Sequence, residues 1–573
     1  MPNTTRHNPI TFFEDYKGKD FNGEWPTVVE MFDISVKRFK NNSCFRQFVP
    51  SELEFNYTQA REKIVSAANY ILTYAEPKDK IALCGKNSVE WAISYLAILY
   101  AGCIVVPLDA NLKDHEIEKL MKFAGVKALY ADKNKVDVLD KDDKLGLLKR
   151  VSLEIGDEEK YILNNLVKGD LDEKAYKPVS EDIAAILFTS GTTGTPKGVM
   201  LTHENLVSDC YLAQFNMEIL PTDVFYAILP IHHAYTMLAV FIEAISVGAS
   251  VIFGKRLIIS QVLKELKVGK VTMFLGVPML FNKLLAGLLN GVKKKSIILY
   301  GLIRFMMGIS GVIKKITKKN VGHKMFKFLL KQISLDTNRI CICGGGPLPS
   351  STFKMFNELG IDFVQGYGLT ETSPITHLNP TYAYIESSVG KLIPTLEQKI
   401  VNPDKEGNGV LYLKGSVVMK GYYKNKKATD EVLDKDGWLC TGDVGHIDSN
   451  GYLYLTGRAK NIIVTEGGKN VFPEEIEDHF QLYNEIDQIC IVPFIKNEAT
   501  KSEGIRALIY PNQDWVKEEG DEKAEKRINQ IIEEINKESQ PYKRIEKILI
   551  TKEPLPTTST KKIKRFEVAK LYK

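Results

Sequence analysis

The stretch "LFTSGTTGTPKGVML", from Leu187 to Leu201, holds three glycines, five hydroxyl side chains, a proline and a lysine. Before it, the segment "DIAAILF" (Asp182–Phe188) is apolar and free of Gly and Pro, which predicts a buried strand. After it, Thr202 is a typical helix cap in front of apolar residues at helical spacing. The sequence therefore predicts a polar, glycine-rich loop that joins a strand to a helix.

A loop of this composition suits an anion such as a polyphosphate. Glycines let the backbone approach a ligand closely, and free amide groups, hydroxyls and a lysine attract negative charge. It is not a Walker P-loop, which needs Gly before the Lys and Ser or Thr after it, because Lys197 stands between Pro196 and Gly198. The alternative is an ordinary surface loop, since Gly and Thr are common in loops.

Composition places the chain among globular proteins of more than one domain. It has 573 residues, of which 44% are hydrophobic and 26% charged. Its first residues lack the basic-then-apolar pattern of a signal peptide, so we expect a cytoplasmic protein. Eight scattered cysteines without a CxxC pair argue against a disulfide framework or a zinc site.

Charge is unevenly distributed along the chain. The net charge is +5, yet no carboxylate occurs between Glu265 and Asp336, while twelve Lys or Arg residues lie from 283 to 331. The rest of the chain is therefore net negative. We call residues 283–335 the basic insert, and we expect no nucleic-acid partner.

The order of apolar segments predicts an α/β fold. Strand-like and helical segments alternate over residues 55–135 and again over 182–369, which predicts parallel sheets covered on both faces. Residues 374–456 are shorter, turn-rich segments typical of antiparallel strands. We therefore predict a large N-terminal domain (1–457) of parallel α/β sheets plus a small antiparallel barrel, followed by a small mobile α+β C-terminal domain (458–573).

Further motifs carry groups that suit a nucleotide. "ICGGGPLP" (Ile342–Pro349) follows a strand-like segment, and "VQGYGLTETS" (Val364–Ser373) has an aromatic residue between two glycines. In the second motif Tyr367 can stack on a base and Glu371 can hold Mg²⁺. In "DGWLCTGDVGHID" a Gly-flanked Asp443 can accept both hydroxyls of a ribose. Taken singly, each motif is explained equally well by an ordinary turn.

Together, these motifs resemble the adenylate-forming superfamily over residues 55–566, and the closest resemblance is to fatty acyl-CoA synthetases of the long-chain type. The resemblance implies two steps. A carboxylate first attacks the α-phosphorus of MgATP, giving an acyl-adenylate and pyrophosphate. The thiol of coenzyme A then attacks the acyl carbon and expels AMP.

The resemblance also implies roles for nucleotide-binding residues. The glycine-rich loop would hold the β- and γ-phosphates through Thr189, Ser190, Gly191, Thr192, Thr193, Gly194, Thr195 and Lys197. The adenine site would comprise Gly344, Gly345, Gly346, Gln365, Gly366, Tyr367 and Gly368. Asp443 and Arg458 would anchor the ribose.

Other residues would carry the chemistry and the switch between steps. Thr370 would contact the α-phosphate, Glu371 would bind Mg²⁺, and Lys562 would bridge the substrate carboxylate and the α-phosphate. Many relatives read Thr-Gly-Lys where this chain reads Thr-Lys-Lys, so Lys561 is the alternative. His233 would lie beside the acyl site, or it is a packed core histidine. Two residues would serve the second step, as the hinge and as the border of the pantetheine channel: Lys460 and Gly468.

A fatty acid is the expected substrate. Amino-acid-activating relatives place an Asp where this chain reads "LPIHHAYTM", which has no acid, and the apolar segments nearby can line an acyl tunnel or simply pack the core. The alternatives are a medium-chain or aryl acyl-CoA synthetase, an acyl-AMP ligase that loads a carrier protein, a luciferase-like oxygenase, and a catalytically silent lipid-binding scaffold.

The basic insert contains an apolar stretch, Ser296 to Ile313, with lysines at both ends. It is marginal for a membrane span, and Arg304 at its middle would be costly there. On a helix, small and basic residues share one face opposite the large apolar ones, which is typical of a helix that lies in an anionic membrane surface; that face comprises Gly301, Arg304, Gly308, Gly311 and Lys315. We therefore expect peripheral membrane contact through residues 293–319, on the inner face of the membrane, with an amphipathic helix packed on the core as the alternative.

Overall fold

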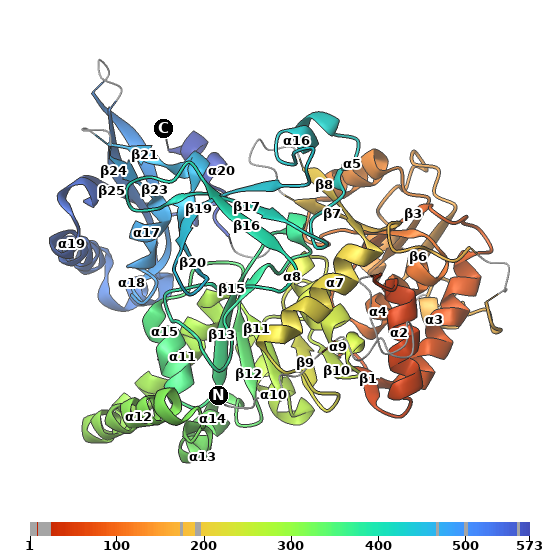
Figure 1. The fold of residues 1–573 in the computed structure, drawn as a ribbon, viewed down its shortest axis with the longest axis horizontal. Coiled ribbons are helices and arrows are strands. Elements are labelled where there is room, and N and C mark those ends of the chain that lie inside the picture. Colours follow the sequence, from red (N-terminus) through yellow and green to blue (C-terminus); the bar gives the residue numbers. More distant parts are fainter. Residues whose placement is uncertain are drawn as a thin grey trace.

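The computed structural model describes residue 9 and residues 24–156, 158–171, 176–189, 196–465, 469–497, 502–558 and 562–572. Two large sheets with helices against their faces form most of the chain, and the C-terminal region, residues 458–572, lies beside them at the upper left of Figure 1. The predicted α/β fold class is confirmed.

One sheet has seven strands in the order β18-β8-β7-β4-β3-β5-β6. Neighbours from β7 to β6 run parallel, whereas β8 is antiparallel to β7 and β18 is antiparallel to β8. The strands are β3 (Lys80–Cys84), β4 (Ile104–Pro107), β5 (Ala128–Ala131), β6 (Lys149–Ser152), β7 (Ile183–Thr189), β8 (Lys197–Thr202) and β18 (Gly421–Tyr422).

The other sheet has thirteen strands in the order β16-β17-β19-β20-β15-β14-β13-β12-β11-β9-β10-β1-β2. Its parallel part comprises β13 (Asp362–Tyr367), β12 (Ile340–Cys343), β11 (Met273–Gly276), β9 (Val224–Ala227), β10 (Ser250–Phe253) and β1 (Ser43–Gln47), with β2 (Leu53–Asn56) antiparallel at the edge. Its antiparallel part comprises β14 (His377–Leu378), β15 (Gly390–Leu392), β16 (Glu397–Val401), β17 (Gly409–Lys414), β19 (Leu439–Ile447) and β20 (Tyr452–Arg458).

The antiparallel strands, which were predicted as a small barrel, are joined to the parallel sheet. In the described chain they are an open extension of the parallel sheet, because β14 pairs with β13 edge to edge. This pairing carries Tyr367, at the end of β13, directly into the antiparallel part. Groups from both kinds of sheet therefore meet at one place.

A helical layer between the sheets forms the main core. The helix α4 (Val89–Tyr100) is buried along its whole length, and its first turn is capped by the Ser88 hydroxyl. Within it Trp91 stacks on Tyr95, with ring centroids 5.3 Å apart. Other helices of this part are α2 (Val28–Arg38), α3 (Tyr57–Ile71), α5 (Asp114–Ala124), α6 (Lys133–Val136), α7 (His203–Ala213), α8 (Ala234–Thr236), α9 (Glu243–Ser246), α10 (Ile259–Gly269) and α16 (Lys426–Asp430).

The prediction of a strand-to-helix loop after β7 is wrong. The loop joins two antiparallel strands, because "KGVML" forms β8 and pairs with β7 from Thr189↔Lys197 to Ile183↔Thr202. The four apolar or small residues from Gly198 to Leu201 suit a buried strand as well as a helix start, so periodicity could not separate the two. The helix cap was placed correctly, since the Thr202 hydroxyl accepts a hydrogen bond from the Asn205 amide at 3.1 Å.

The C-terminal region has a hydrophobic cluster of its own, built largely from isoleucines between Ile463 and Ile545. Its three-stranded sheet comprises β23 (Ile486–Asn497), β24 (Ser502–Pro511) and β25 (Lys547–Ile550), and β21 (Ile463–Val464) pairs with β22 (Asn470–Val471). Its helices are α17 (Pro473–Asp478), α18 (Gln513–Glu519), α19 (Asp521–Glu538) and α20 (Arg565–Leu571).

The basic insert is helical and lies at the lower left of Figure 1. It comprises most of α11 (Pro278–Lys295), then α12 (Ile297–Thr317), α13 (Gly322–Met325) and α14 (Lys327–Leu330), and α12 packs on α11 and on α15 (Ser350–Glu358). Among the described residues, only α12 is both long enough and apolar enough to cross a membrane. In its most apolar 18-residue stretch, 28% of the residues are buried.

Candidate active site

The strands β7 and β8 hold the two ends of the glycine-rich loop together. Thr189 ends β7, Lys197 begins β8, and the Thr189 hydroxyl donates to the Lys197 carbonyl oxygen at 3.5 Å. The loop residues between them that were assigned to phosphate binding lie outside the described residues: Ser190, Gly191, Thr192, Thr193, Gly194 and Thr195. The strand pair thus fixes where the loop begins and ends.

Tyr422, which the sequence analysis missed, links this loop to Glu371. Because β18 pairs with β8, the Tyr422 ring lies 4.6 Å from the Lys197 Nζ, in cation–π geometry. The Tyr422 hydroxyl donates to Glu371 Oε1 at 2.8 Å. Burial, then the Glu371 carboxylate, raises the pKa of Tyr422, so it remains a donor at neutral pH.

Thr370 and Glu371 lie on a short 3₁₀ turn, Thr370–Thr372, directly after β13. The backbone of this turn is held by the Met419 amide, which donates to the Glu371 carbonyl oxygen at 2.9 Å. Glycine is required just before it, since a Cβ at Gly368 would meet the Pro374 carbonyl oxygen at 1.6 Å. The turn therefore presents both side chains at the junction of the two parts of the thirteen-stranded sheet.

Asp443 is a buried carboxylate held between two strands. Arg458, its cross-strand partner on β20, places Nε 2.8 Å from Asp443 Oδ1, and the Tyr367 hydroxyl donates to Oδ2 at 2.5 Å. The Asp443 amide donates to Thr441 Oγ1 at 3.1 Å. A carboxylate can accept about four hydrogen bonds, so Asp443 retains acceptor capacity for a diol.

The triple-glycine turn follows β12 and lies against Tyr235. Gly345 has a φ of +81°, and a Cβ at Gly344 would lie 3.0 Å from the Tyr235 ring. The Tyr235 hydroxyl donates to the Ile342 carbonyl oxygen at 3.1 Å. On the neighbouring strand β13 lie Gln365 and Gly366, and Gln365 is paired with Cys343, just before Gly344. The turn and the QGYG segment are thus adjacent, with Gly346 completing the turn.

His233 lies at the start of the helix that Tyr235 belongs to. Burial lowers the pKa of His233 to about 3, and the charges of His232 and Lys562 lower it while Asp109 opposes them. The ring of His232 lies 4.2 Å from that of His233, tilted by 42°, and its Nε2 is 3.6 Å from Asp109 Oδ2. His233 is therefore a neutral imidazole near a lysine of the C-terminal region. A π-helical turn, Met237–Ile242, follows, and such turns are common at functional sites.

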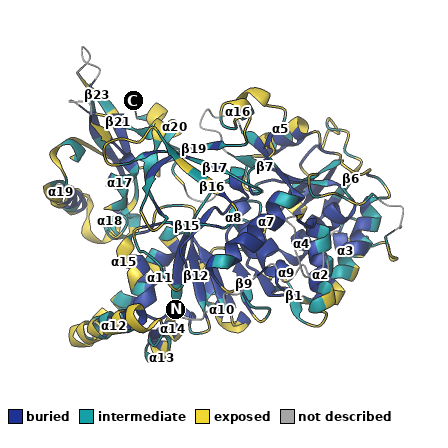
Figure 2. Cartoon of the chain, viewed as in Figure 1, coloured by how far each residue is buried: buried dark blue, intermediate teal, exposed yellow. Residues whose placement is uncertain are grey.

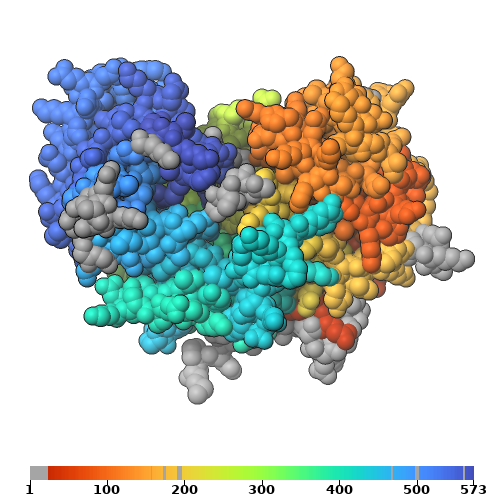
Figure 3. Space-filling view, turned by 90° about the horizontal axis from the view of Figure 1, so that it is seen from above, coloured from red at the N-terminus to blue at the C-terminus, as the bar shows by residue number. Residues whose placement is uncertain are grey.

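Lys562 lies across from Asp443 and Arg458. It belongs to a tight turn in which its carbonyl oxygen accepts from the Thr558 amide at 2.8 Å. Surrounding protein atoms lower the pKa of Lys562, the Arg458 charge lowers it further, and Asp443 opposes both. Lys562 nevertheless remains solvent-exposed. Figure 3 shows a hollow between the C-terminal region (blue) and the N-terminal part (orange).

Lys460 belongs to the same group of charges. It follows β20 on a short turn, Ala459–Asn461, and its pKa is lowered by burial and then by Arg458, with a smaller contribution from Lys197. Four cations and three carboxylates therefore belong to this group of charges, so the cations exceed the carboxylates by one; they are Lys197, Arg458, Lys460, Lys562, Glu371, Asp443 and Glu474.

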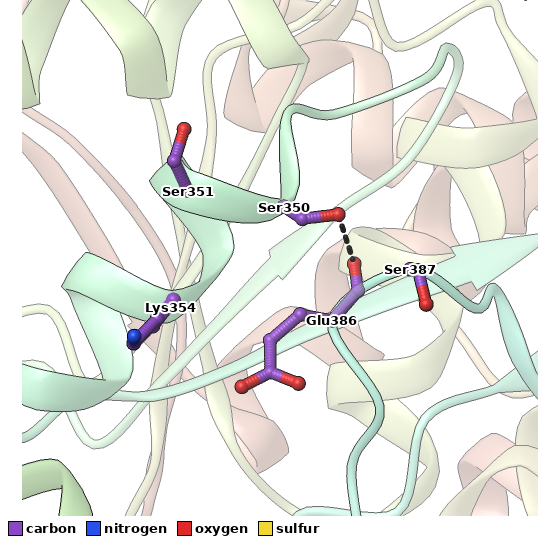
Figure 4. Close-up of a pocket in the computed structure, with 5 residues that line it drawn as sticks. All are labelled: Ser350, Ser351, Lys354, Glu386 and Ser387. Carbon is purple, nitrogen blue, oxygen red and sulfur yellow. Dashed lines mark hydrogen bonds between the residues drawn. The ribbon is translucent and has the colours of Figure 1, made fainter.

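Gly468, assigned to the pantetheine channel, falls outside the described residues, as does Lys561. The pocket in Figure 4, lined by residues of α15 and the 386–387 loop, contains none of the predicted site residues. There the Ser350 hydroxyl donates to the Glu386 carbonyl oxygen at 3.3 Å.

The AMP-binding enzyme family matches residues 32–423, and the C-terminal domain of AMP-binding enzymes matches residues 460–573. The first match alone covers more than half of the chain. The chain belongs to the AMP-binding enzyme family, and the predicted membership of the adenylate-forming superfamily is confirmed.

Relatives of this AMP-binding enzyme are named for different activities. The chain is 30% identical over 425 residues to a luciferin 4-monooxygenase of Photuris pensylvanica, covering 70% of each chain. It is 27% identical to the long-chain-fatty-acid–CoA ligase ACSBG2 of Mus musculus, covering 79% of this chain and 72% of the relative. It is 25% identical to the chloroplastic long-chain-fatty-acid–[acyl-carrier-protein] ligase AEE15 of Arabidopsis thaliana, covering 96% and 86%.

Solved structures of the same fold include the anthranilate CoA ligase AuaEII in complex with anthranoyl-AMP. That chain superposes with a TM-score of 0.77 at 20% identity, covering 97% of this chain and 99% of the other. The two-part architecture of this AMP-binding enzyme is therefore that of solved adenylate-forming enzymes.

Proposed function

We propose that this enzyme activates a long-chain fatty acid with ATP and transfers the acyl group to coenzyme A. The observation that carries the proposal is the position of Lys562, whose charge interacts with Arg458, Asp443 and His233. A carboxylate near His233 and a nucleotide near Asp443 would both lie within reach of that one cation. In the first step the acid oxygen attacks the α-phosphorus, and pyrophosphate leaves.

The charged group supports this step by neutralising the nucleotide. Lys197 and the loop that it ends would hold the β- and γ-phosphates, and Thr370 would contact the α-phosphate. Preorganised cations that face developing charge contribute most of the stabilisation in such reactions, because phosphoryl chemistry is largely a matter of positioning. Asp443, with spare acceptor capacity, would take the ribose hydroxyls.

Glu371 fits a Mg²⁺ ion only together with the nucleotide. One of its oxygens already accepts from Tyr422, and the described residues contain no group of three His, Cys, Asp or Glu side chains that could hold a metal. Mg²⁺ typically takes one or two carboxylates and completes its octahedron with phosphate oxygens and water. The ion would supply charge neutralisation at the phosphates, and Glu371 would position it.

The long-chain acid is supported by the residues after His233. They form the buried, wholly apolar turn Met237–Ile242, and the segment "LPIHHAYTM" around His233 has no acid to pair with the ammonium group of an amino-acid substrate. A fully buried methylene contributes about 0.8 kcal/mol, so a long apolar slot gives affinity that grows with chain length. Two of the relatives carry long-chain-fatty-acid names. We also propose a cytoplasmic location.

The acceptor has a second candidate, because the relative named as an acyl-carrier-protein ligase aligns with 96% of this chain. Pyrophosphate release with MgATP should be measured for fatty acids of about six to eighteen carbons and for benzoate-type acids, with affinity expected to rise with length. Products should then be identified by mass spectrometry with coenzyme A or a carrier protein as acceptor.

We expect turnover that peaks at long chains and a coenzyme A thioester as product. If the thioester forms on the carrier protein alone, the acceptor is a carrier protein and not coenzyme A. If turnover is highest with aryl acids, the substrate is an aryl acid and not a fatty acid. No pyrophosphate with any acid would contradict the proposed reaction and favour a silent lipid-binding scaffold.

A further inference from the structure

The helix α12 turns a row of large apolar side chains towards solvent. These residues recur at alternating spacings of four and three, so they share one side of the helix, and they are 43% to 81% exposed. Figure 2 shows the exposed colour along α12 at the lower left. We call them the outer stripe: Ile298, Leu302, Phe305, Ile309, Val312 and Ile316.

The opposite side of α12 is fixed to the protein. Ile303 and Met307 are buried in the core of this part, and Gly311 lies against the Glu358 side chain of α15. The buried Lys314 places its Nζ 2.6 Å from Asp362 Oδ1, and Lys315 pairs with Glu386 at 2.8 Å. The outer stripe therefore cannot turn inward without breaking a buried ion pair, which is costly.

Basic residues flank the outer stripe at both ends. Lys293, Lys294 and Lys295 are exposed before the helix, and Lys318 and Lys319 are exposed after it. No carboxylate occurs from residue 266 to residue 335 to neutralise them. The result is a rod of about 31 Å, at about 1.5 Å per residue, with an apolar outer side and cationic ends.

We propose that α12 docks this enzyme onto an anionic lipid bilayer, with the outer stripe in the acyl region at the surface and the flanking lysines among the headgroups. Apolar area drives binding of such helices, and lysines add electrostatic attraction to anionic lipids. The docking does not depend on which acid the enzyme activates.

Two other fates of α12 conflict with the structure. Crossing the bilayer would place the Lys314–Asp362 pair and the packed inner side in hydrocarbon. Pairing with a second copy of the helix would bring lysine clusters together. In a parallel pair, each cluster would meet its own copy, and in an antiparallel pair, the cluster before one helix would meet the cluster after the other. Since the insert has no carboxylate to compensate, an anionic surface fits these charges better than a second copy.

Vesicle cosedimentation with the full chain tests the proposal. Vesicles of phosphatidylcholine alone and with about 30% phosphatidylglycerol separate the apolar from the electrostatic contribution. The test variant is Ile298→Gln/Phe305→Gln/Ile316→Gln. The matched control is Leu148→Gln/Ile155→Gln/Val179→Gln, which changes three apolar residues of 54% to 57% exposure elsewhere on the surface.

We expect the wild type and the control to bind anionic vesicles, and the test variant to lose binding at least about tenfold, since three apolar anchors are removed. Raised salt and Lys293→Ser/Lys294→Ser/Lys295→Ser should weaken binding to anionic vesicles only. Equal melting temperature and pyrophosphate release in all variants would show intact folding. No wild-type binding, or equal binding by the test variant, would overturn the proposal, as would concentration-dependent dimers that the test variant abolishes.

Discussion

The site is built from two halves that are held in different ways. In the N-terminal half, Tyr367, Asp443 and Arg458 are joined by hydrogen bonds across strands of one sheet. In the C-terminal half, Lys562 stands on a short turn, and the two regions touch through contacts such as Gln481 Nε2 to the Pro347 carbonyl oxygen at 3.2 Å.

The difference separates binding from chemistry. Groups fixed on a sheet are suited to hold a nucleotide throughout a reaction, whereas a cation carried by another region can be present for one step and absent for the next. Removing a group from the C-terminal half should therefore impair a step, and removing one from the N-terminal half should impair nucleotide binding.

The largest effect is expected for Lys562→Ala. Adenylate formation should slow by about 10²–10³-fold, because a preorganised cation at the reacting centre is lost, while ATP affinity changes little. Single-turnover formation of the acyl-adenylate measures the rate, and equilibrium binding measures the affinity. Lys564→Ala is the matched control, since Lys564 lies two residues after Lys562 and pairs with Glu567 instead. An equal loss of rate in both variants, or a large loss of ATP affinity in Lys562→Ala, would contradict the separation of chemistry in the C-terminal half from binding in the N-terminal half.

A smaller effect of the opposite kind is expected for Asp443→Asn. The change leaves Arg458 and Tyr367 without their buried carboxylate, and breaking a buried ion pair typically costs about 3–5 kcal/mol. The KM for ATP should rise at least about tenfold, more than kcat falls, and the melting temperature should drop. Asp430→Asn, at an exposed ion pair with Lys426, is the control. A lower kcat with an unchanged KM for ATP would mean that Asp443 acts in the chemical step and not in nucleotide binding.

Tyr422→Phe tests whether the Tyr422 hydroxyl in the N-terminal half positions Glu371. It removes the hydroxyl that donates to Glu371 and keeps the ring against Lys197, and a hydrogen bond to a charged group contributes about 1.5–3 kcal/mol. We expect roughly a tenfold loss in kcat/KM for ATP, measured over a range of Mg²⁺ concentrations. Tyr423→Phe, whose hydroxyl donates to the Ala124 carbonyl oxygen, should be near wild type. Equal kinetics for both variants would leave Tyr422 a packing residue.

The last prediction concerns pH, because burial lowers the pKa of four histidines in the N-terminal half: His203, His232, His233 and His377. Burial lowers the pKa of His203 to about 4, of His377 to about 4 and of His233 to about 3. An unfolded histidine has a pKa of about 6.5, so the unfolded state binds more protons below that pH, and stability falls as the pH drops below 6.5. Above 6.5 these groups contribute no pH dependence.

Each histidine should contribute about 1.4 kcal/mol per pH unit below 6.5. Melting temperatures at pH 7.5 and 5.5 measure the sum, and His203→Gln should reduce the difference between them. The same pH dependence in His203→Gln and wild type would contradict a neutral, buried His203.

Most of the fold could be predicted from local pattern. The strand at Lys80–Cys84, the helix at Val89–Tyr100 and the strand at Ile104–Pro107 all lie where alternating apolar segments predicted them. The pattern failed at β8, where the four residues from Gly198 to Leu201 fit either a strand or a helix start, and pairing with β7 decided the outcome. It also could not show that the antiparallel strands continue the parallel sheet, because strand neighbours depend on long-range pairing.

Site residues that belong to a sequence motif could be predicted, whereas those brought to the site only by strand pairing or by long-range contacts could not. The structure brings Glu371, Asp443 and Lys562 into one charged group, as the motifs suggested. Tyr422 was missed because residues 374–456 were predicted only as antiparallel strands, whereas β17 belongs to the thirteen-stranded sheet and β18 to the seven-stranded one. Tyr235 was missed because its contact with the triple-glycine turn joins segments about a hundred residues apart.

The central claim is that this site makes an acyl-adenylate. The most direct measurement is a rapid-quench experiment with α-labelled ATP, Mg²⁺ and a long-chain fatty acid, first without and then with coenzyme A. The account predicts acyl-adenylate and pyrophosphate in equal amounts before coenzyme A is added, and conversion to thioester and AMP afterwards. ADP and phosphate as products, or no adenylate with any carboxylic acid, would contradict it.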